Sequence, residues 1–319
     1  MRLNFLGTGR RSLNTDGQNA DADLLTELTQ LARRILPNEH SAPVLLSSRS
    51  GRLVMRLGHL VIKVHGPRAD DHDLGLRLKL VAEAPFDEIF LSPLPNEYPD
   101  LAGPFTTIWP AGEPVDANLE QIPWQAAAEL LARLHRSPLP AYPFPISQGM
   151  KRVTDTLAKL QAQSWDKWQP DLRAVLSAAA TLSFTDRQLL CLVHGDWHLG
   201  QMVSISLNGK DSWRLIDVED LGLGDPAWDL ARPAAFFAAG LIAPGDWDLF
   251  LDSYRAAGGP AVESFENPWQ SLDMPARALI VQCAAAALIR SKQSYTPLSD
   301  AELHLVDACR RISFEEKKS

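Results

Sequence analysis

The most informative part of the sequence, Leu189 to Ala231, reads LLCLVHGDWHLGQMVSISLNGKDSWRLIDVEDLGLGDPAWDLA. It opens with a short apolar run, Leu189–Val193, which predicts a buried strand. Two further strand-like runs, Met202–Ser206 and Trp213–Ile216, flank the pair Asn208-Gly209. Because Asn-Gly between apolar runs is a strong hairpin signal, the stretch predicts one strand followed by a β-hairpin.

Polar clusters lie on either side of this predicted hairpin. The cluster before it contains His194, Asp196, His198 and Gln201, and the cluster after it contains Asp217, Glu219 and Asp220. An isolated Asp after Gly is most often a turn residue. Two acidic clusters on one hairpin instead favour a cation held between a catalytic loop and a metal-binding loop.

Three blocks within the stretch carry a family resemblance. They are His-Gly-Asp-x-His-x-x-Gln from His194, Ile-Asp-x-Glu-Asp from Ile216, and Gly-Asp-Pro-x-x-Asp-Leu-Ala from Gly224. In this order and at this close spacing they resemble the aminoglycoside phosphotransferase family of kinase-like small-molecule kinases. The resemblance implies an α+β, bilobal protein-kinase-like fold, with a small, mainly β N-terminal lobe and a larger, mainly helical C-terminal lobe. It also implies ATP and Mg²⁺ as cofactors.

The resemblance further implies roles for individual residues. Asp196 is expected to be the catalytic carboxylate beside the attacking hydroxyl, and Asp217 to bind magnesium that bridges the nucleotide phosphates. Gln201 replaces the family's usual magnesium-binding Asn and keeps an amide oxygen on a longer arm, which is similar to the maltokinase and bacterial glucosamine-kinase branches. This replacement disfavours an antibiotic as the acceptor. Asp229 matches the position that braces the catalytic loop through hydrogen bonds.

Strands are also predicted near the N-terminus, at Val44–Leu46, Leu53–Leu57 and Leu60–Val64. Lys63 lies in the third of them, where a lysine alone is most often a solvated residue on an exposed strand face. The resemblance implies instead the kinase lysine that pairs the nucleotide's phosphates. The loop that contains Ser50 takes the place of the phosphate-covering loop, whose backbone N–H groups can face phosphate.

A helix from Asp70 to Ala84 follows, and in a kinase-like fold its carboxylate holds the lysine. Asp73 and Glu83 lie on one helical stripe, so the sequence leaves both open. Asp73 is preferred because Glu83 lies close to the end of the helix. Another helix, Asp23–Leu36, lies in the region before the resemblance and is expected to pack on the N-terminal lobe.

The hinge between the two lobes is predicted where strand-like sequence stops. The runs Ile89–Leu91 and Phe105–Trp109 predict two strands, and Pro110-Ala111-Gly112 breaks the pattern. Adenine is expected to form hydrogen bonds with the backbone near Trp109 to Ala111. The Trp109 side chain itself is equally consistent with facing adenine and with packing. The predicted division is an N-terminal extension at 1–40, a nucleotide-binding lobe at 41–110 and a catalytic and acceptor-binding lobe at 111–319.

Beyond the hinge the sequence is mostly helical in pattern. Predicted helices cover residues 124–135, 153–168, 171–182, 247–256, 274–290 and 300–312. Four side chains in this later region are candidates for the acceptor pocket, although solvated faces and core explain each of them at least as well: Trp269, Asp273, Arg277 and Gln282.

Composition limits the partners and the compartment. The 319 residues contain 31 basic and 39 acidic side chains and carry a net charge of −8, which disfavours a nucleic-acid partner. The widely spaced Cys191, Cys283 and Cys309 indicate neither a disulfide framework nor a zinc site, and they favour reduced thiols in the cytoplasm. The most apolar run, Ala278–Ile289, is too short to span a bilayer, so no membrane partner is expected.

Several functions remain open from the sequence. The favoured one is an ATP-dependent phosphotransferase that moves the γ-phosphate to a hydroxyl of a small molecule, a sugar or amino sugar; an aminoglycoside or other antibiotic kinase is the alternative. A metal-dependent hydrolase is more distant, because His194, Asp196 and His198 share one face of an extended segment. A non-catalytic kinase-like binding protein is another. A protein kinase is disfavoured because Asp217 lies too close to the Gly-Asp-Pro block for an activation segment.

Overall fold

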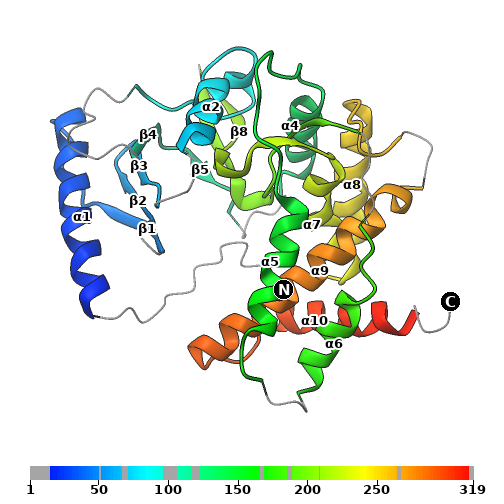
Figure 1. Ribbon diagram of the computed structural model, residues 1–319. Coiled ribbons are helices and arrows are strands. Elements are labelled where there is room, and N and C mark those ends of the chain that lie inside the picture. Colours follow the sequence, from blue (N-terminus) through cyan, green and yellow to red (C-terminus); the bar gives the residue numbers. More distant parts are fainter. Residues whose placement is uncertain are drawn as a thin grey trace. The chain divides into compact units, whose positions relative to one another are not determined.

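In the computed structural model the described residues are 15–49, 52–66, 71–95, 106–116, 122–165, 169–184, 189–207, 209–263 and 267–315. They form two compact units. The sheet unit contains the described residues up to Val115 together with Gly200–Glu219. The helical unit contains those in Asp116–Leu199 and those after Glu219. Figure 1 labels the elements of both units.

The sheet unit is built on four antiparallel strands in the order β1-β2-β3-β4. These strands are β1 (Val44–Arg49), β2 (Arg52–Leu57), β3 (Leu60–Val64) and β4 (Thr106–Pro110). The three predicted N-terminal strands and the strand that ends near Trp109 are therefore confirmed. Successive side chains of a strand point to opposite faces of the sheet. One face of this sheet is apolar and buried, and the other carries more exposed side chains.

Helix α1 (Thr15–Ile35) covers the apolar face of this sheet. Leu28, Leu31 and Ala32 of the helix are buried in one cluster with strand residues such as Met55 and Ile62. Figure 1 shows α1 running alongside β1, β2 and β3. The helix is thus part of the core of the sheet unit, as its predicted packing implies, and residues 15–40 are not separable from the strands that follow.

The remaining elements of the sheet unit differ from prediction in one place. Its short elements are α2 (Asp71–Val81), the 3-10 helix η1 (Phe86–Glu88), β5 (Glu113–Pro114), β7 (Met202–Leu207) and β8 (Lys210–Leu215), and β5, β7 and β8 form a three-stranded sheet. The predicted strand Ile89–Leu91 is wrong, because only Phe90 forms an isolated bridge, to Leu215. The chain there follows η1 directly, and it pairs with β8 at one residue instead of forming a run of paired residues.

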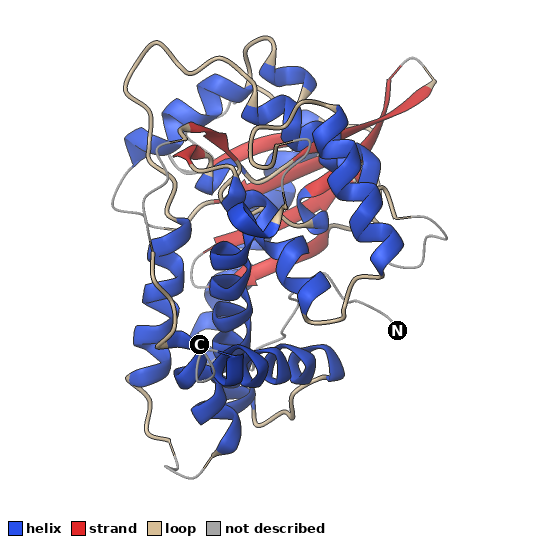
Figure 2. Cartoon of the chain, turned by 90° about the vertical axis from the view of Figure 1, so that its right-hand side faces the viewer, coloured by secondary structure: helices blue, strands red, loops and turns tan. Residues whose placement is uncertain are grey.

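The helical unit contains one short antiparallel strand pair and a set of helices. Its elements are α4 (Trp124–His135), α5 (Gly149–Gln161), α6 (Pro170–Ala179), β6 (Cys191–Val193), β9 (Gly222–Gly224), α7 (Ala227–Ala238), α8 (Pro244–Ala256), α9 (Trp269–Ser294) and α10 (Asp300–Glu315). Around the C-terminal label, Figure 2 shows several helices, drawn in blue. Two short 3-10 helices, η2 (Leu199–Gln201) and η3 (Val218–Asp220), lie where the chain passes from one unit to the other.

Helix α9 is longer than the sequence pattern predicted. By length and composition it is the one helix among the described residues that could cross a membrane. The expectation that this region is too short to span a bilayer was therefore wrong about its length. Its apolar window is 61% buried inside the protein, and it packs on α5, α6, α7 and α10. Burial on several sides is typical of a central helix in a globular unit, and it explains why the helix is apolar over so much of its length.

The two units differ from the predicted division of the chain. The boundary after the hinge lies at Val115 and not at residue 110, and the hairpin segment Gly200–Glu219 belongs to the sheet unit. The hairpin does so because β5 pairs with β7, Glu113 lying opposite Ser204. The α+β class is confirmed, with a four-stranded sheet in one unit and mostly helices in the other.

Candidate active site

The loop that contains Asp196, the predicted catalytic loop, begins directly after β6 in the helical unit. Strand β6 pairs with β9, which places Val193 opposite Gly222, and the next residues are His194, Gly195 and Asp196. Gly195 has a φ of 82°, and an added Cβ would lie 2.2 Å from the carbonyl oxygen of Asp220. Only glycine therefore fits between the loop and the segment that follows Glu219.

Asp229, at the start of α7, holds this loop in place through hydrogen bonds. Its carboxylate accepts the backbone N–H of His194 at 2.6 Å and of Gly195 at 2.9 Å. His135 Nε2 lies 3.0 Å from the same carboxylate. Burial opposes the charged form of Asp229, but the contacts with His135 and the loop outweigh it and lower the pKa of the carboxyl. The predicted bracing role is confirmed.

The brace continues into two further helices of the helical unit. His135 ends α4, and its Nδ1 lies 2.8 Å from the hydroxyl of Tyr254 on α8. That hydroxyl also accepts the backbone N–H of Ala261 at 3.1 Å. Tyr254 and both side chains of the His135–Asp229 pair are buried. The orientation of the catalytic loop is thus fixed by a buried polar chain from α8 through α4 to α7.

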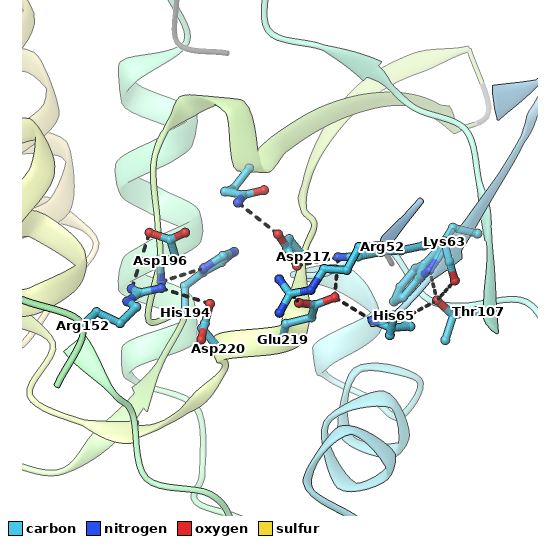
Figure 3. A network of polar contacts seen from close by, with 12 residues as sticks. Arg52, Lys63, His65, Thr107, Arg152, His194, Asp196, Asp217, Glu219 and Asp220 are labelled. Atoms are coloured by element: carbon cyan, nitrogen blue, oxygen red, sulfur yellow. Dashed lines mark hydrogen bonds and ion pairs between the residues drawn. The ribbon is translucent and has the colours of Figure 1, made fainter. Parts of the chain in front are cut away.

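Two arginines reach Asp196, and the sequence pattern predicted neither of them. Arg232 of α7 donates from Nη2 to Asp196 Oδ1 at 2.9 Å. Arg152 of α5 lies 3.4 Å from the same oxygen, pairs with Asp220 at 3.0 Å and also donates to the Gly195 carbonyl. Figure 3 shows Arg152 between Asp196 and Asp220. The predicted catalytic carboxylate therefore has positive charge on two sides.

A small pocket lies beside Asp196 within the helical unit. Its walls include both arginines together with Trp197, Trp228 and Gln282. Gln282 is the predicted acceptor-site residue that lines this pocket. The other three candidates lie elsewhere: Arg277 pairs with Asp273 at 2.9 Å along α9, and Trp269 stacks on Trp247 and Phe237.

The second face of the four-stranded sheet carries the polar residues of the sheet unit. Leu60 and Ile62 point into the core under α1, so the alternation of β3 places Lys63 on the opposite face. Lys63 lies directly across from Thr107 of β4 in the strand register. One strand thus supplies both the apolar contact with α1 and the lysine of the candidate site.

Lys63 is held by two carboxylates from the segment after β8. Its ammonium lies 2.8 Å from Asp217 Oδ1 and 3.1 Å from Glu219 Oε1. Burial disfavours the charged ammonium, but the two carboxylates outweigh this cost and raise the pKa of Lys63. Pairing of the lysine with Asp73 or Glu83 of the α2 region stays a prediction.

Asp217 has two features expected of a metal-binding residue. Its φ is 65°, a left-handed conformation that is uncommon for a residue other than glycine and that concentrates at functional sites. Gln201 Nε2 lies 3.3 Å from Asp217 Oδ2, so the amide and the carboxylate are neighbours. Carboxylate and amide oxygens are ligands that magnesium accepts, and rotation of the Gln201 amide would present its oxygen. The two predicted ligands therefore fit a magnesium ion.

A buried histidine completes the polar cluster of the sheet unit, and sequence reasoning missed it. His65 follows β3, with Nδ1 2.6 Å from Glu219 and Nε2 2.8 Å from the hydroxyl of Thr107. Arg52 lies 3.5 Å from the other Glu219 oxygen. Figure 3 shows these residues converging on Glu219. The signal available in the sequence was the alternation of β3, which places Lys63 and His65 on one face.

The predicted nucleotide contacts near the hinge have three different outcomes. The Trp109 side chain is 8% exposed and donates from Nε1 to Thr107 at 2.8 Å, so it packs in the sheet unit. The backbone N–H of Ala111 donates to the His59 carbonyl at 2.7 Å. Adenine contacts of the backbone there stay a prediction. Ser50 lies outside the described residues.

The hydrolase alternative finds no support in the geometry. Among the described residues no group of three or more His, Cys, Asp and Glu side chains is placed to hold a metal ion. Asp196 is paired with arginines, and its backbone N–H faces His194 Nδ1 at 3.4 Å. The His194-Asp196-His198 pattern therefore shapes a loop and does not form a zinc-type ligand set.

Comparison with known proteins agrees with this arrangement. The sequence model described as the phosphotransferase enzyme family matches residues 107–268, about half of the chain. No curated protein matches the chain by sequence. The matched range includes the loop that contains Asp196, the hairpin, and Asp229.

Similar solved structures share the fold at low sequence identity. A choline/ethanolamine kinase family protein from Mesorhizobium loti is 17% identical with a TM-score of 0.57, over 92% of this chain and 95% of that one. Choline kinase LicA from Streptococcus pneumoniae is 15% identical with a TM-score of 0.58, over 90% and 99%. A thermostable mutant of aminoglycoside phosphotransferase APH(4)-Ia is 14% identical with a TM-score of 0.58, over 91% and 99%. These likenesses confirm the kinase-like fold.

Proposed function

The chain belongs to the phosphotransferase enzyme family, and we propose that it is a small-molecule kinase that transfers the γ-phosphate of ATP to a hydroxyl of a sugar-like acceptor. The observation that carries the proposal is the braced Asp196 next to a small pocket in the helical unit. The solved structures of similar fold include choline kinases and an aminoglycoside phosphotransferase, which supports an acceptor of low molecular weight.

The nucleotide side of the reaction is assigned to the sheet unit. Lys63 would pair the phosphates of ATP, as a charged ammonium that two carboxylates keep protonated. Asp217 and Gln201 would hold a magnesium ion, whose chemistry is to neutralise charge on the phosphate oxygens. A structure of LicA contains AMP, which supports nucleotide use in this fold.

The acceptor side is assigned to Asp196. Its carboxylate would accept the proton of the acceptor hydroxyl while that oxygen bonds to the γ-phosphorus and the bond to the β–γ bridging oxygen breaks, releasing ADP. Asp229 holds the two N–H groups before Asp196 and so fixes the direction of the carboxylate. Positioning of this kind, with no covalent intermediate, is what phosphoryl transfer requires of the protein.

Asp196→Asn tests this assignment. The amide keeps the size of the side chain and can still accept a hydrogen bond from Arg232, so fold and ATP–magnesium affinity are expected to stay near wild type. The chemical step should slow by about 10² or more, because the general base is lost. Single-turnover transfer from ATP, nucleotide affinity and melting temperature are measured on the same protein.

The exposed Asp211→Asn on the hairpin is the matched control. It makes the same chemical change outside the candidate site and should leave all three measurements unchanged. Transfer at the wild-type rate by the Asp196→Asn variant would remove the centre of the proposal. Joint loss of stability and nucleotide binding would make Asp196 a structural residue.

A further inference from the structure

The pocket beside Asp196 has an unusual charge for a site that would take a cationic acceptor. Its walls contain one carboxylate, Asp196, and two guanidinium groups, Arg152 and Arg232. We infer that the acceptor is a hydroxylated anion, in which an acidic group stands close to the hydroxyl that is phosphorylated. The inference rests on the proposed function and names the chemical class of its acceptor.

The two arginines differ in how far the protein uses their donors. Arg152 donates hydrogen bonds to Asp220, at 3.0 Å, and to the Gly195 carbonyl. It also forms an ion pair with Asp196, so its contacts hold the loop in place. Among the described residues Arg232 has one charged partner, Asp196 at 2.9 Å, and a weak acceptor, the Cys283 sulfur at 3.7 Å. A guanidinium has five N–H donors. Arg232 therefore has donors to spare at the pocket wall.

An unused donor of Arg232 bears on recognition. Its Nε, like that of Arg152, is buried and has no hydrogen-bond partner among the described residues, although Nη2 is bonded. Buried donors without partners are costly, and a ligand oxygen that bonds Nε would remove that cost. Arginine presents its N–H groups in a planar fork that matches carboxylates and phosphates. The group best suited to Arg232 is thus an acidic one.

The position of Arg232 also limits where the acidic group lies in the acceptor. The guanidinium bonds Oδ1 of Asp196, the carboxylate that would receive the hydroxyl proton. A molecule bonded to both must carry its hydroxyl and its acidic group a few bonds apart. Hydroxy acids and sugar acids meet this requirement. An ammonium at the same place would face the guanidinium of Arg232 at short range, so amino sugars and choline are disfavoured.

The reaction itself is unchanged by the acidic group. The acceptor oxygen bonds to the γ-phosphorus, the bond to the bridging oxygen breaks, ADP leaves and the proton passes to Asp196. Arg232 stays charged throughout and takes no proton. It acts as a specificity residue that touches the acceptor, while Arg152 positions the loop.

The first test compares molecules that differ in charge and little in shape. One set is glucuronate, glucose and glucosamine, and the other is glycerate, glycerol and 3-aminopropane-1,2-diol, with choline as a further cation. Binding to the full chain is measured calorimetrically without nucleotide, at constant ionic strength. We expect the anion of at least one set to bind about tenfold or more tightly than its neutral and cationic relatives. Equal binding, no binding by any anion, or preference for a cation would overturn the inference.

The second test changes the charge of the wall. Arg232→Gln should reduce the affinity for the preferred anion about ten- to a hundredfold and leave the affinity for its neutral relative within about threefold. Arg232→Lys keeps the charge and should restore much of the preference. Arg255→Gln, in α8 and away from the pocket, is the matched control and should bind as wild type.

These measurements also separate the inference from the proposed function. An anion that binds through Arg232 but is never phosphorylated in the presence of ATP and magnesium would leave the acceptor site standing and remove the kinase. Phosphorylation of glucosamine or choline in preference to the acids would leave the kinase standing and remove the anionic acceptor. An anion preference that Arg232→Gln leaves intact would show that Arg232 is not the recognising group.

Discussion

Among the single residues of the sheet unit, Glu219 is a partner of Lys63 that the sequence did not predict. Glu219 lies within reach of Lys63, His65 and Arg52 and is itself 5% exposed. A carboxylate that serves three cationic or polar groups in a buried place is costly to remove, because those groups lose their compensation together. Glu219 therefore contributes to the architecture of the site, although it was not among the predicted site residues.

Glu219→Gln measures that contribution. The isosteric amide leaves Lys63 with one carboxylate, Asp217, and we expect the free energy of unfolding to fall by about 2 to 3 kcal/mol. Denaturant titration of the nucleotide-free protein gives the value. Glu113→Gln is the matched control, because that carboxylate also pairs with an arginine of the sheet unit but is 70% exposed. It should cost less than about 1 kcal/mol; equal costs would contradict the proposed weight of Glu219.

The residues that the sequence could and could not predict differ in one physical respect. Asp196, Gln201 and Asp217 lie in short motifs whose spacing is local, so one sequence suffices to find them. Arg152 and His65 meet these motifs only through tertiary packing, from α5 and from the end of β3. A lone arginine in a helical pattern reads as a solvated residue, and nothing in its surroundings reveals that it faces a carboxylate.

At the scale of elements, the β6–α7 region is a loop fixed from two sides. Asp220 leaves no space for a Cβ at Gly195, and Asp229 holds the two N–H groups of the turn. The motif could be predicted, but the reason for its glycine could not. That reason is the approach of a backbone carbonyl from a segment more than twenty residues further along the chain.

Gly195→Ala tests the close approach. The left-handed φ alone costs about 1 to 2 kcal/mol for a residue with a Cβ. The contact with the Asp220 carbonyl adds to it, so we expect the free energy of unfolding to fall by about 3 kcal/mol or more. Gly240→Ala separates the two contributions, since Gly240 has a φ of 76° and nothing within 4 Å of an added Cβ. Equal losses in the two variants would show that backbone strain is the whole effect.

The Asp229 brace predicts a pH dependence of stability. The pKa of Asp229 is lowered below its usual 3.8 in the folded protein, so the unfolded chain binds a proton first as the pH falls. The stabilisation is present above about pH 4 and is lost as the pH falls through the folded pKa. The difference in unfolding free energy between wild type and Asp229→Asn should therefore be largest near neutral pH and shrink below pH 4.

Denaturant titrations at several pH values, each with the exposed Asp248→Asn as control, give this comparison. The control should alter the free energy of unfolding little at every pH. A wild-type advantage over Asp229→Asn that stays constant into acid would contradict a role for the ionised carboxylate. It would leave only the shape of the side chain as the brace.

At the scale of the whole molecule, the sequence predicted the class of the fold better than the extent of its units. The α+β pattern and most elements could be read from periodicity, because an apolar stripe or alternation is local. Where a unit begins and ends depends on which apolar faces meet. Residues 15–40 read as an extension because no motif falls there, whereas Leu28 and Leu31 are at most 1% exposed in the core of the sheet unit.

Leu31→Ala decides between an appended helix and an integral one. If α1 covers the sheet, the substitution leaves a cavity against Met55 and Ile62, and the free energy of unfolding should fall by about 2 to 5 kcal/mol. The exposed neighbour Gln30→Ala is the matched control, with an expected change within about 0.5 kcal/mol. The readout is the denaturation midpoint of the full chain. An appended helix would unfold independently of the strands, so Leu31→Ala would then shift the midpoint no more than Gln30→Ala. In that case some other element would have to cover the apolar face of the four strands.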